Sequence, residues 1–483
     1  MSKENNEKKS SAKQLLAGGL LIISTVCLTA SAVYLYDTYQ ESKTKVDTYV
    51  NSVQDAVVEG GSGESSTKVD SSEQPISKDM EPNQTNQESN QQEETKHQQD
   101  GETSVADNNQ ELQGSQSADG EDTGNTELEQ IVADSNPIDE VIHTKSTPPC
   151  KVKGIYVSGP MAGSTNNMAN LIDLVESTEL NTMVIDVKND SGEITYKMDN
   201  EVAKEINATV NYITNIQELV TKLKEKGVYL IARVVAFKDP ILAKNKPELS
   251  LKNANGTIFR DKAGLAWVNP YKKEVWEYLV SVAKDAANIG FDEVQFDYIR
   301  FSTDSGMKQV DFGEEAKDKT KIEAITDFTK YAYEELSPLG IYVSADVYGT
   351  IINSEIDAKI VGQSYVEMSK YLDYICPMIY PSHYANGSYG IDYPDLEPYY
   401  LIKKVLEESK MVLKVNDEVE HQAIVRPWLQ DFTATWVEKH QKYDAKEIKE
   451  QIQGVYDSGY EEWILWNGSN RYTSGGLLDN KQE

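Results

Sequence analysis

Beyond about residue 150, the chain alternates between short apolar runs and stretches in which apolar side chains recur every three or four positions. Near-continuous apolar runs that are rich in β-branched and aromatic residues are typical of strands covered on both faces. The periodic stretches between them predict amphipathic helices. Eight strands are predicted in this way, over residues 154–158, 182–188, 229–235, 293–301, 341–348, 374–380, 423–429 and 462–467.

Helices are predicted between consecutive strands. Thr214 with Gln217 three residues later predicts a capping box, and Asn269 before Pro270 predicts another helix N-terminus. This strand–helix alternation predicts an α/β fold with a parallel sheet. Eight strands favour a closed (β/α)8 TIM barrel over an open sheet, and no strand is followed by a glycine-rich nucleotide-binding fingerprint. The predicted helices cover residues 167–179, 214–226, 270–290, 322–336, 366–371, 399–409 and 445–457.

The N-terminal part predicts membrane insertion. Four lysines precede an uncharged apolar run over residues 15–36, whose length of about 22 residues is enough to cross a bilayer. The lysines place the N-terminus on the cytoplasmic side. We therefore expect a cytoplasmic tail over 1–14 and a transmembrane signal anchor over 15–36, so that the protein is a single-pass membrane protein. The sequence Ala30-Ser31-Ala32 resembles a signal-peptide cleavage site, which leaves a secreted chain as the alternative.

Residues 37–149 are predicted to form a disordered extracellular stalk. Most of this segment is rich in Gln, Glu, Ser, Asn and Asp and nearly free of aromatic residues, so it cannot bury enough apolar surface to fold. The formal net charge of the whole chain is −32, which argues against a nucleic acid as partner. Three cysteines imply no disulfide framework, and five histidines without paired spacing favour no metal site. No cofactor is expected, and residues 150–483 form the predicted barrel.

The segment 293–301 combines a buried strand pattern with charged residues at its end. Asp297, Tyr298 and Arg300 follow the apolar part, and an unpaired buried charge costs several kcal/mol. Asp297 and Arg300 must therefore be paired or lie at an open strand end. In a TIM barrel, polar residues at the C-terminal ends of strands indicate the active site. A structural Asp–Arg pair that fastens a loop is the alternative.

The other strand ends carry carboxylates and aromatic rings together. Aromatic faces stack on the C–H faces of sugar rings, while carboxylates, amides and guanidinium groups bind hydroxyls, so this mixture predicts a carbohydrate site. The loop over 236–268 is predicted to form one wall of a substrate cleft. The candidate substrate-binding residues are Asp186, Arg233, Tyr298, Arg300, Tyr380, His383, Arg426, Trp428, Asp431, Trp466 and Asn467.

Structural roles remain open for several of these residues. Asp186 can pair with a neighbouring cation, Asp431 can cap a turn, and Trp428 and Trp466 can belong to the barrel core. The catalytic candidates are Asp297 and Asp346, which end consecutive predicted strands. Glycosidic cleavage requires two carboxyl groups, separated by roughly 5–5.5 Å in retaining enzymes and about 6.5–9.5 Å in inverting ones. The sequence does not choose between these outcomes.

We expect Asp297 to act as nucleophile or base and Asp346 as general acid, although the two roles can be exchanged. This chemistry needs no metal. A metal-dependent deacetylation through Asp186 and His383 is a minor alternative, and it would be sensitive to chelators.

Several sequence blocks resemble a bacterial family of glycosyl hydrolase domains that was long catalogued as a domain of unknown function. The resemblance extends from Val152 to Leu478 and implies a glycosidase-like (β/α)8 barrel with Asp297 and Asp346 at matching motif positions. The family often has proline where this chain has Ser302. The blocks are Gly290–Phe301, Ser344–Gly349, Pro377–Tyr384, Arg426–Phe432 and Trp463–Asn467.

An anchor followed by a stalk also resembles the surface architecture of a Gram-positive bacterium. We therefore expect a membrane-anchored extracellular glycoside hydrolase that acts on a cell-envelope or environmental polysaccharide. A non-catalytic glycan-binding barrel of the cell surface is the alternative, because barrels lose chemistry without losing their fold.

Overall fold

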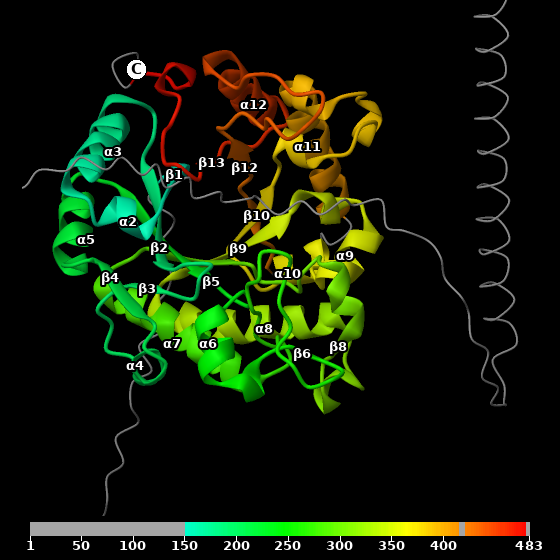
Figure 1. The fold of residues 1–483 in the computed structure, drawn as a ribbon. Coiled ribbons are helices and arrows are strands. Elements are labelled where there is room, and N and C mark those ends of the chain that lie inside the picture. The colour runs from blue at the N-terminus through cyan, green and yellow to red at the C-terminus, as the bar shows by residue number, and fades with distance from the viewer. Residues whose placement is uncertain (1–149, 415–420, 480–483) are drawn as a thin grey trace, which may run out of the picture. The chain divides into compact units, whose positions relative to one another are not determined.

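The computed structural model describes residues 150–414 and 421–479, which form a closed parallel barrel surrounded by helices (Figure 1). The first strand pairs in parallel with both the second and the last, and this double pairing closes the ring. The predicted eight-stranded barrel is confirmed. In chain order its strands are β1 (Lys153–Val157), β2 (Thr182–Lys188), β5 (Tyr229–Val235), β7 (Glu293–Asp297), β9 (Tyr342–Tyr348), β10 (Tyr374–Met378), β11 (Ile424–Val425) with β12 (Trp428–Gln430), and β13 (Trp463–Trp466).

Most strand ends lie within two residues of the prediction, but two strands differ from it more clearly. The fourth strand, β7, ends at Asp297 rather than at Phe301, because Tyr298 has a φ of 48° and so leaves the extended conformation. The seventh strand is divided into β11 and β12 around Pro427, whose ring nitrogen cannot donate a ladder hydrogen bond. β11 pairs with β10, whereas β12 pairs with both β10 and β13.

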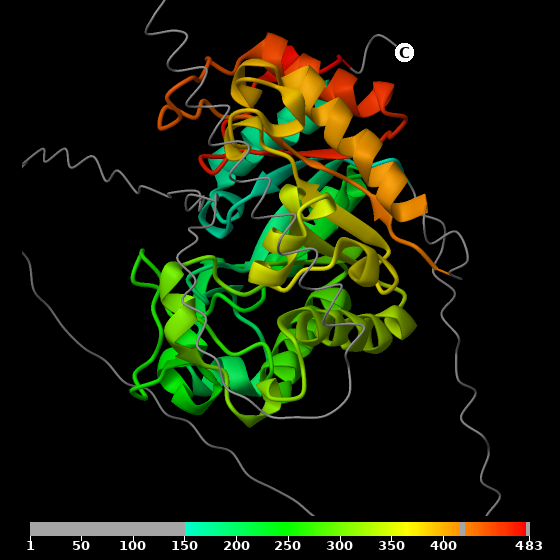
Figure 2. The same cartoon turned by 90° about the vertical axis from the view of Figure 1, so that its right-hand side faces the viewer.

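Helices connect the strands and cover the outside of the barrel. Those between consecutive barrel strands include α2 (Gly159–Ala162), α3 (Thr165–Ser177), α4 (Glu201–Glu205), α5 (Ile216–Glu225), α6 (Pro240–Asn245), α7 (Lys273–Ile289), α8 (Lys321–Leu336), α9 (Glu355–Val361), α10 (Tyr365–Ser369), α11 (Pro398–Lys414) and α12 (Ala445–Asp457). The last two pack against each other, as two views at right angles show (Figures 1 and 2).

Both predicted helix starts are wrong in detail. Helix α5 is capped by Asn215, whose side chain accepts a hydrogen bond from the backbone N–H of Glu218, and not by Thr214. Helix α7 begins at Lys273 rather than at Pro270; the side-chain amide of Asn269 donates to the carbonyl of Phe312, and its oxygen accepts from the backbone N–H of Tyr271. The predicted C-terminal end of α7 is confirmed, since Gly290 adopts a left-handed φ of 111° directly after it.

Short strands outside the barrel organise two of the loops. After β2, the chain forms β3 (Ile194–Tyr196), which pairs antiparallel with β2, and then β4 (Thr209–Ile213), which pairs with β3. The loop over residues 236–268 contains α6 and β6 (Lys252–Asn253), and β6 pairs with β8 (Val310–Asp311) from the loop after β7. The loops that follow strands three and four are therefore joined.

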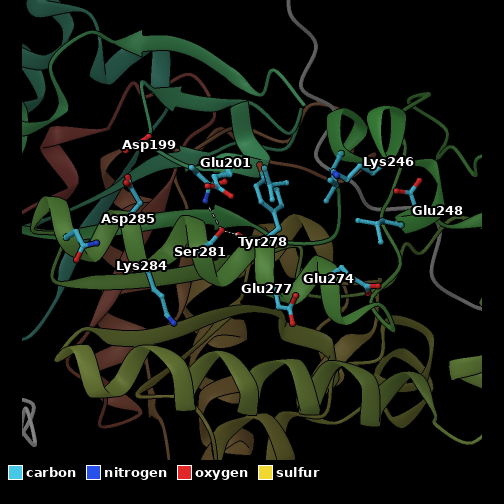
Figure 3. A pocket seen from close by; sticks show the side chains of 15 residues that line it. Asp199, Glu201, Lys246, Glu248, Glu274, Glu277, Tyr278, Ser281, Lys284 and Asp285 are labelled. Carbon is cyan, nitrogen blue, oxygen red and sulfur yellow. Dashed lines mark hydrogen bonds between the residues drawn. The ribbon is translucent and has the colours of Figure 1, made fainter. Parts of the chain in front are cut away.

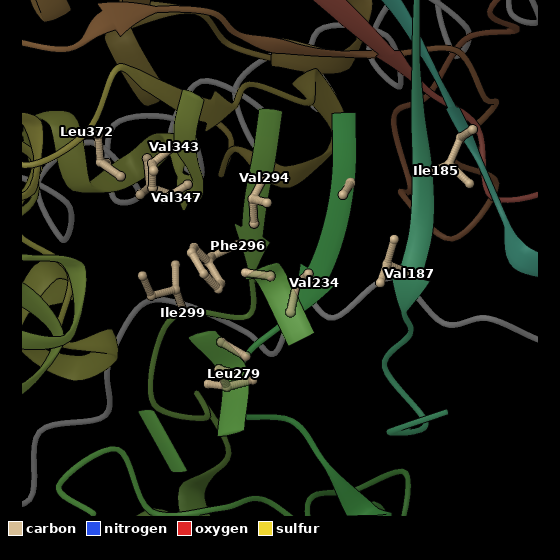
Figure 4. Close-up of a cluster of buried hydrophobic side chains, with 14 of the residues drawn as sticks. Ile185, Val187, Val234, Leu279, Val294, Phe296, Ile299, Val343, Val347 and Leu372 are labelled. Atoms are coloured by element: carbon tan, nitrogen blue, oxygen red, sulfur yellow. The ribbon is translucent and has the colours of Figure 1, made fainter. Parts of the chain in front are cut away.

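The apolar core has two layers. Outward-facing side chains of the strands pack against the helices, as Val294 and Phe296 of β7 and Leu279 of α7 illustrate (Figure 4). A second cluster fills the barrel interior and includes Val184 and Ile231. Because side chains alternate along a strand, the inward-facing and outward-facing positions of a strand belong to different layers, and the inward-facing positions of β7 are the polar residues Glu293, Gln295 and Asp297.

The predicted cytoplasmic tail, signal anchor and stalk (1–14, 15–36 and 37–149) lie outside the described residues. Within the part of the chain that the structure describes, no helix combines the length and apolar character needed to cross a membrane.

Candidate functional site

Asp297 and Asp346 lie side by side at the carboxyl ends of neighbouring strands. The register of β7 and β9 pairs Phe296 with Ala345, so the two aspartates occupy the next position on each strand. Phe296 faces the outer core, where its ring lies 5.3 Å from that of Phe328. By alternation, both aspartates face the barrel interior.

The carboxylate of Asp297 is held by Arg233 of β5. Its Oδ2 accepts hydrogen bonds from Nε and Nη2 of Arg233 at 3.0 and 2.6 Å, and its Oδ1 accepts one from the backbone N–H of Tyr298 at 2.6 Å. Two of these three hydrogen bonds come from a guanidinium, so the carboxylate of Asp297 is paired with a buried cation. Asp297 is 7% exposed, so it remains at the edge of the buried region.

Asp346 has a different environment. It is 2% exposed, and its Oδ1 accepts one hydrogen bond, from the indole N–H of Trp428 at 2.6 Å. Burial raises the pKa of Asp346 well above its usual value, and the negative charge of Asp297 raises it further. The Trp428 hydrogen bond and the charge of Arg233 oppose this shift, but burial is the largest cause. Asp346 therefore retains its proton at pH values where an exposed aspartate is ionised.

Asp186 of β2 joins the same cluster through Arg233. Its Oδ1 accepts a hydrogen bond from Nη1 of Arg233 at 2.6 Å, and its Oδ2 accepts one from the hydroxyl of Tyr156, also at 2.6 Å. Trp466 stacks on Tyr156 with ring centroids 4.3 Å apart, and the guanidinium carbon of Arg233 lies 5.6 Å from the Trp466 ring. Arg233 thus connects two carboxylates and an aromatic wall, and the structure brings Asp186, Arg233, Trp428 and Trp466 together with both catalytic candidates.

Tyr298 and Arg300 form the side of the site next to the loop over 236–268. The guanidinium carbon of Arg300 lies 4.9 Å from the ring centroid of Tyr298 and 5.1 Å from that of Trp267, which belongs to this loop. Lys238, from the same loop, places its ammonium 4.6 Å from the ring centroid of Tyr298. The left-handed φ of 48° at Tyr298 is unusual for a residue with a side chain, and such strain clusters at functional sites.

Tyr380 and His383 follow β10, which is separated from β7 by β9 alone. Burial raises the pKa of Tyr380, and the negative charges of Asp346 and Asp297 add to the effect, which places this phenol close to both carboxylates. Burial lowers the pKa of His383 to about 4. Its Nδ1 lies 3.0 Å from the hydroxyl of Ser382. A neutral imidazole at physiological pH can exchange hydrogen bonds with a sugar hydroxyl.

Two further aromatic residues, which the sequence analysis did not select, lie next to Tyr380 and His383. Phe432 lies 5.9 Å from the Tyr380 ring, and Trp436 stacks on Phe432 at 5.9 Å with an interplanar angle of 19°. Trp436 is 61% exposed. The available signal was an aromatic pair four positions apart in the polar loop after the seventh strand.

Three candidates do not join the set. Arg426 is fully buried inside the barrel and binds Glu293 at 2.8 Å and Glu462 at 3.0 Å, so its donors face away from any ligand at the strand ends. Asp431 accepts hydrogen bonds from the N–H and the hydroxyl of Thr473. The side-chain amide of Asn467 donates to the carbonyl of residue 471 in its own loop and to that of residue 431 in the loop after β12. All three residues stabilise the structure around the site, and their side chains are not part of the surface that a substrate would contact.

A separate pocket of about 640 Å³ lies among the outer helices α4, α6 and α7 (Figure 3). Its lining contains no barrel-strand residue and none of the candidate residues, and many of its side chains are acidic, including Glu201, Glu274 and Glu277. Asp285 in this lining accepts a hydrogen bond from Tyr196 at 2.9 Å. The pocket is therefore distinct from the cluster around Asp297 and Asp346.

The family described as "Putative glycosyl hydrolase domain" matches residues 154–472, which is most of the described chain. A solved structure of a hypothetical protein from Ruminiclostridium thermocellum is 38% identical, covering 40% of this chain and 97% of that chain, with a TM-score of 0.37. No curated protein gives a significant match.

Two solved structures with described activities are more distant. The PgaB (BpsB) glycoside hydrolase domain from Bordetella bronchiseptica is 13% identical over 66% of this chain and 94% of that chain, with a TM-score of 0.49. The spore cortex-lytic enzyme SleL from Bacillus cereus is 11% identical over 68% of this chain and 74% of that chain, with a TM-score of 0.41.

Proposed function

Because this chain belongs to the putative glycosyl hydrolase domain family, we propose that its barrel cleaves glycosidic bonds in a cell-envelope or environmental polysaccharide, with Asp297 and Asp346 as the catalytic pair. The observation that carries this proposal is the contrast between two adjacent carboxyl groups. Arg233 compensates the charge of Asp297, whereas burial raises the pKa of Asp346. A buried carboxyl group with a raised pKa can act as the acid, and a neighbouring carboxylate that is paired with a cation can act as the base or nucleophile.

In the proposed reaction, Asp346 is the general acid. Its proton passes to the glycosidic oxygen as the bond from that oxygen to the anomeric carbon breaks, and the leaving sugar departs as an alcohol. The carboxylate left on Asp346 is stabilised by the indole N–H of Trp428, which already donates to its Oδ1. Trp428 therefore acts as a positioning residue for the acid.

Asp297 takes the second role, either as the nucleophile that attacks the anomeric carbon or as the base that accepts a proton from the attacking water. Arg233 and the backbone N–H of Tyr298 fix its carboxylate. In both routes the net change is the addition of one water across the glycosidic bond. Trp466, Tyr298, Arg300, Tyr380 and His383 are the proposed sugar-binding residues at the strand ends.

The proposal is tested by incubating the purified chain with peptidoglycan, secondary wall polymer and capsular polysaccharide, and measuring the release of reducing ends. Asp297→Asn and Asp346→Asn are each expected to lower the rate by at least about 100-fold, the usual contribution of a general acid or base. Asp173→Asn, on the exposed face of α3, is the matched control and should retain full activity.

Other outcomes of this experiment would replace the proposal. Binding of a polysaccharide without release of reducing ends would indicate a non-catalytic glycan-binding barrel. Turnover that survives both substitutions but is lost on adding a chelator would indicate metal-dependent chemistry.

We also propose that residues 15–36 anchor the barrel to the outer face of the cell membrane through the stalk over residues 37–149. The support is the uncharged apolar run and the lysines before it. Intact cells treated with protease should lose the barrel, while the N-terminal tail stays protected. A soluble chain in the medium that begins after Ala32 would instead show that the run is a cleaved signal peptide.

A further inference from the structure

The loop between β12 and α12 presents a tryptophan to solvent. Trp436 is 61% exposed and is the only tryptophan among the exposed large hydrophobic residues of the described chain. One face of its ring stacks on Phe432 at a centroid distance of 5.9 Å. This stack leaves contiguous apolar surface of two neighbouring rings in water, where it is accessible to a ligand.

The stack is continuous with the proposed catalytic centre. Tyr380 belongs to the same buried cluster as Trp428, which donates a hydrogen bond to Asp346. The Tyr380 ring contacts Phe432 edge-on at 5.9 Å. His383 lies 6.4 Å from the Phe432 ring and 6.5 Å from the Trp436 ring. A row of rings therefore extends from the two carboxyl groups to the exposed indole.

The loop that carries Trp436 is fixed at both ends by Asp395. Before the loop, Gln430 donates a hydrogen bond to Oδ1 of Asp395 at 3.2 Å. After it, the backbone N–H of Gln441 donates to Oδ2 at 3.1 Å, and the hydroxyl of Tyr443 donates to the Asp395 carbonyl, also at 3.1 Å. The loop also closes on itself, since the N–H of Tyr443 donates to the hydroxyl of Thr433. The exposed indole is therefore held in place before any ligand arrives, which lowers the entropic cost of binding.

We propose that Trp436 and Phe432 form a distal sugar-binding platform, so that the substrate is a glycan chain longer than the segment held at Asp297 and Asp346. This inference rests on the proposed function, because it assigns the platform to the same polysaccharide. The negative face of an aromatic ring attracts the C–H face of a pyranose. The neutral His383 beside the platform offers hydrogen bonds without adding charge. Such a platform adds affinity for a long glycan chain and little for a fragment too short to reach it.

The experiment compares the full wild-type chain with Trp436→Ala, Trp436→Phe and the control Tyr400→Ala, which removes a 55% exposed ring on α11. The probes are peptidoglycan, secondary wall polymer and capsular polysaccharide, each intact and as fragments graded by length. Binding is measured by affinity electrophoresis, and turnover is measured as kcat/KM on the fragments. Trp436→Ala should weaken binding to the polymer by about three- to tenfold, the range expected for one aromatic contact.

The length dependence separates a binding role from a structural one. The loss in kcat/KM for Trp436→Ala should grow with fragment length and vanish for the shortest fragment, whereas Trp436→Phe should recover part of it and Tyr400→Ala should match the wild type. An equal loss at every length, no loss at any length, or a wild-type chain that binds none of the polymers would overturn the platform. If the chain binds but never releases reducing ends, the proposed hydrolysis fails, and polymer binding weakened in Trp436→Ala would still support the platform.

Discussion

Asp297 and Asp346 occupy equivalent positions on β7 and β9, yet their neighbours treat the two charges differently. Three hydrogen bonds reach Asp297, two of them from the guanidinium of Arg233. Asp346 accepts one, from Trp428, and its pKa is raised by burial and by the negative charge of Asp297. The residues around each carboxyl group therefore determine its role. Substitution of these residues should change the pH dependence of activity.

Trp428→Phe should shift the alkaline limb of kcat/KM to higher pH. The indole N–H stabilises the ionised form of Asp346 and so lowers its pKa, which means that removing this donor raises the pKa further. A general acid with a higher pKa stays protonated to higher pH. The profile is measured on the polysaccharide that the wild type cleaves, with Trp436→Phe as the control whose limb should not move. A shift to lower pH would mean that Asp346 is not the acid.

Asp346→Asn should stabilise the fold while it removes activity. The folded-state pKa of Asp346 lies above its unfolded value of about 4, so the folded chain binds a proton that the unfolded chain releases. The wild type therefore loses up to about 1.4 kcal/mol of unfolding free energy for each pH unit between the two pKa values. The amide cannot ionise and can still accept from Trp428. Urea unfolding should show a gain for Asp346→Asn that is larger at pH 8 than at pH 4, and an equal gain at both would contradict the assignment.

At the scale of elements, the hydrophobic pattern predicted most strands correctly, but it did not predict the points at which the backbone changes direction. Strands β2 and β5 match the predicted ranges residue for residue, because apolar residues predominate in both runs. The end of β7 was missed, since the left-handed turn at Tyr298 depends on the surrounding contacts and has no glycine to signal it. Pro427 is a sequence signal for the division of the seventh strand, but the predicted strand range ran through it.

The same limit explains which site residues could be predicted. Asp186, Asp297 and Asp346 lie on continuous strands. Their positions along the barrel axis could therefore be predicted by counting residues along each strand. Arg426 precedes the break at Pro427, and counting along a continuous strand placed it too near the strand ends. Trp436 lies in a loop, where the direction of a side chain does not follow from its position in the sequence as it does in a strand or helix.

Gly290→Ala tests a helix end that was predicted correctly. Gly290 ends α7 with a φ of 111°, and an added Cβ would meet only the Cγ1 atom of Val220 at 3.6 Å, which is an ordinary contact. The cost should therefore come from the backbone and amount to about 1–2 kcal/mol, as for other residues forced into the left-handed region. Urea unfolding measures it, and Gly468→Ala, at a position with open space and no positive φ, should be neutral. Equal effects would refute the backbone explanation.

At the scale of the whole molecule, the barrel interior contains two separate layers of buried charge. The layer at the carboxyl ends of the strands contains Asp186, Arg233, Asp297 and Asp346. A second layer, beginning at the first residue of β7, contains Glu293, Arg426 and Glu462, and the guanidinium carbon of Arg426 lies 3.6 Å from the centroid of the Tyr374 ring. Because Glu293 belongs to β7 and Glu462 directly precedes β13, Arg426 connects strands on different sides of the ring.

Arg426→Met should therefore destabilise the barrel without changing its chemistry. Methionine fills a similar volume but leaves Glu293 and Glu462 buried without their cation, and breaking a buried pair in this way costs about 3–5 kcal/mol. The loss should be smaller at low pH, where the pKa of Glu293, already raised by burial, lets the carboxyl become neutral. Urea unfolding at pH 5 and pH 8 measures this difference, with the exposed Arg471→Met expected to stay within about 0.5 kcal/mol of the wild type. Below the unfolding transition, kcat/KM per folded molecule should change little, because Glu293 acts on Asp346 only through its charge and is the smallest cause of the raised pKa of Asp346. Unaltered stability combined with a raised KM would instead indicate that Arg426 binds the substrate, as the sequence analysis expected.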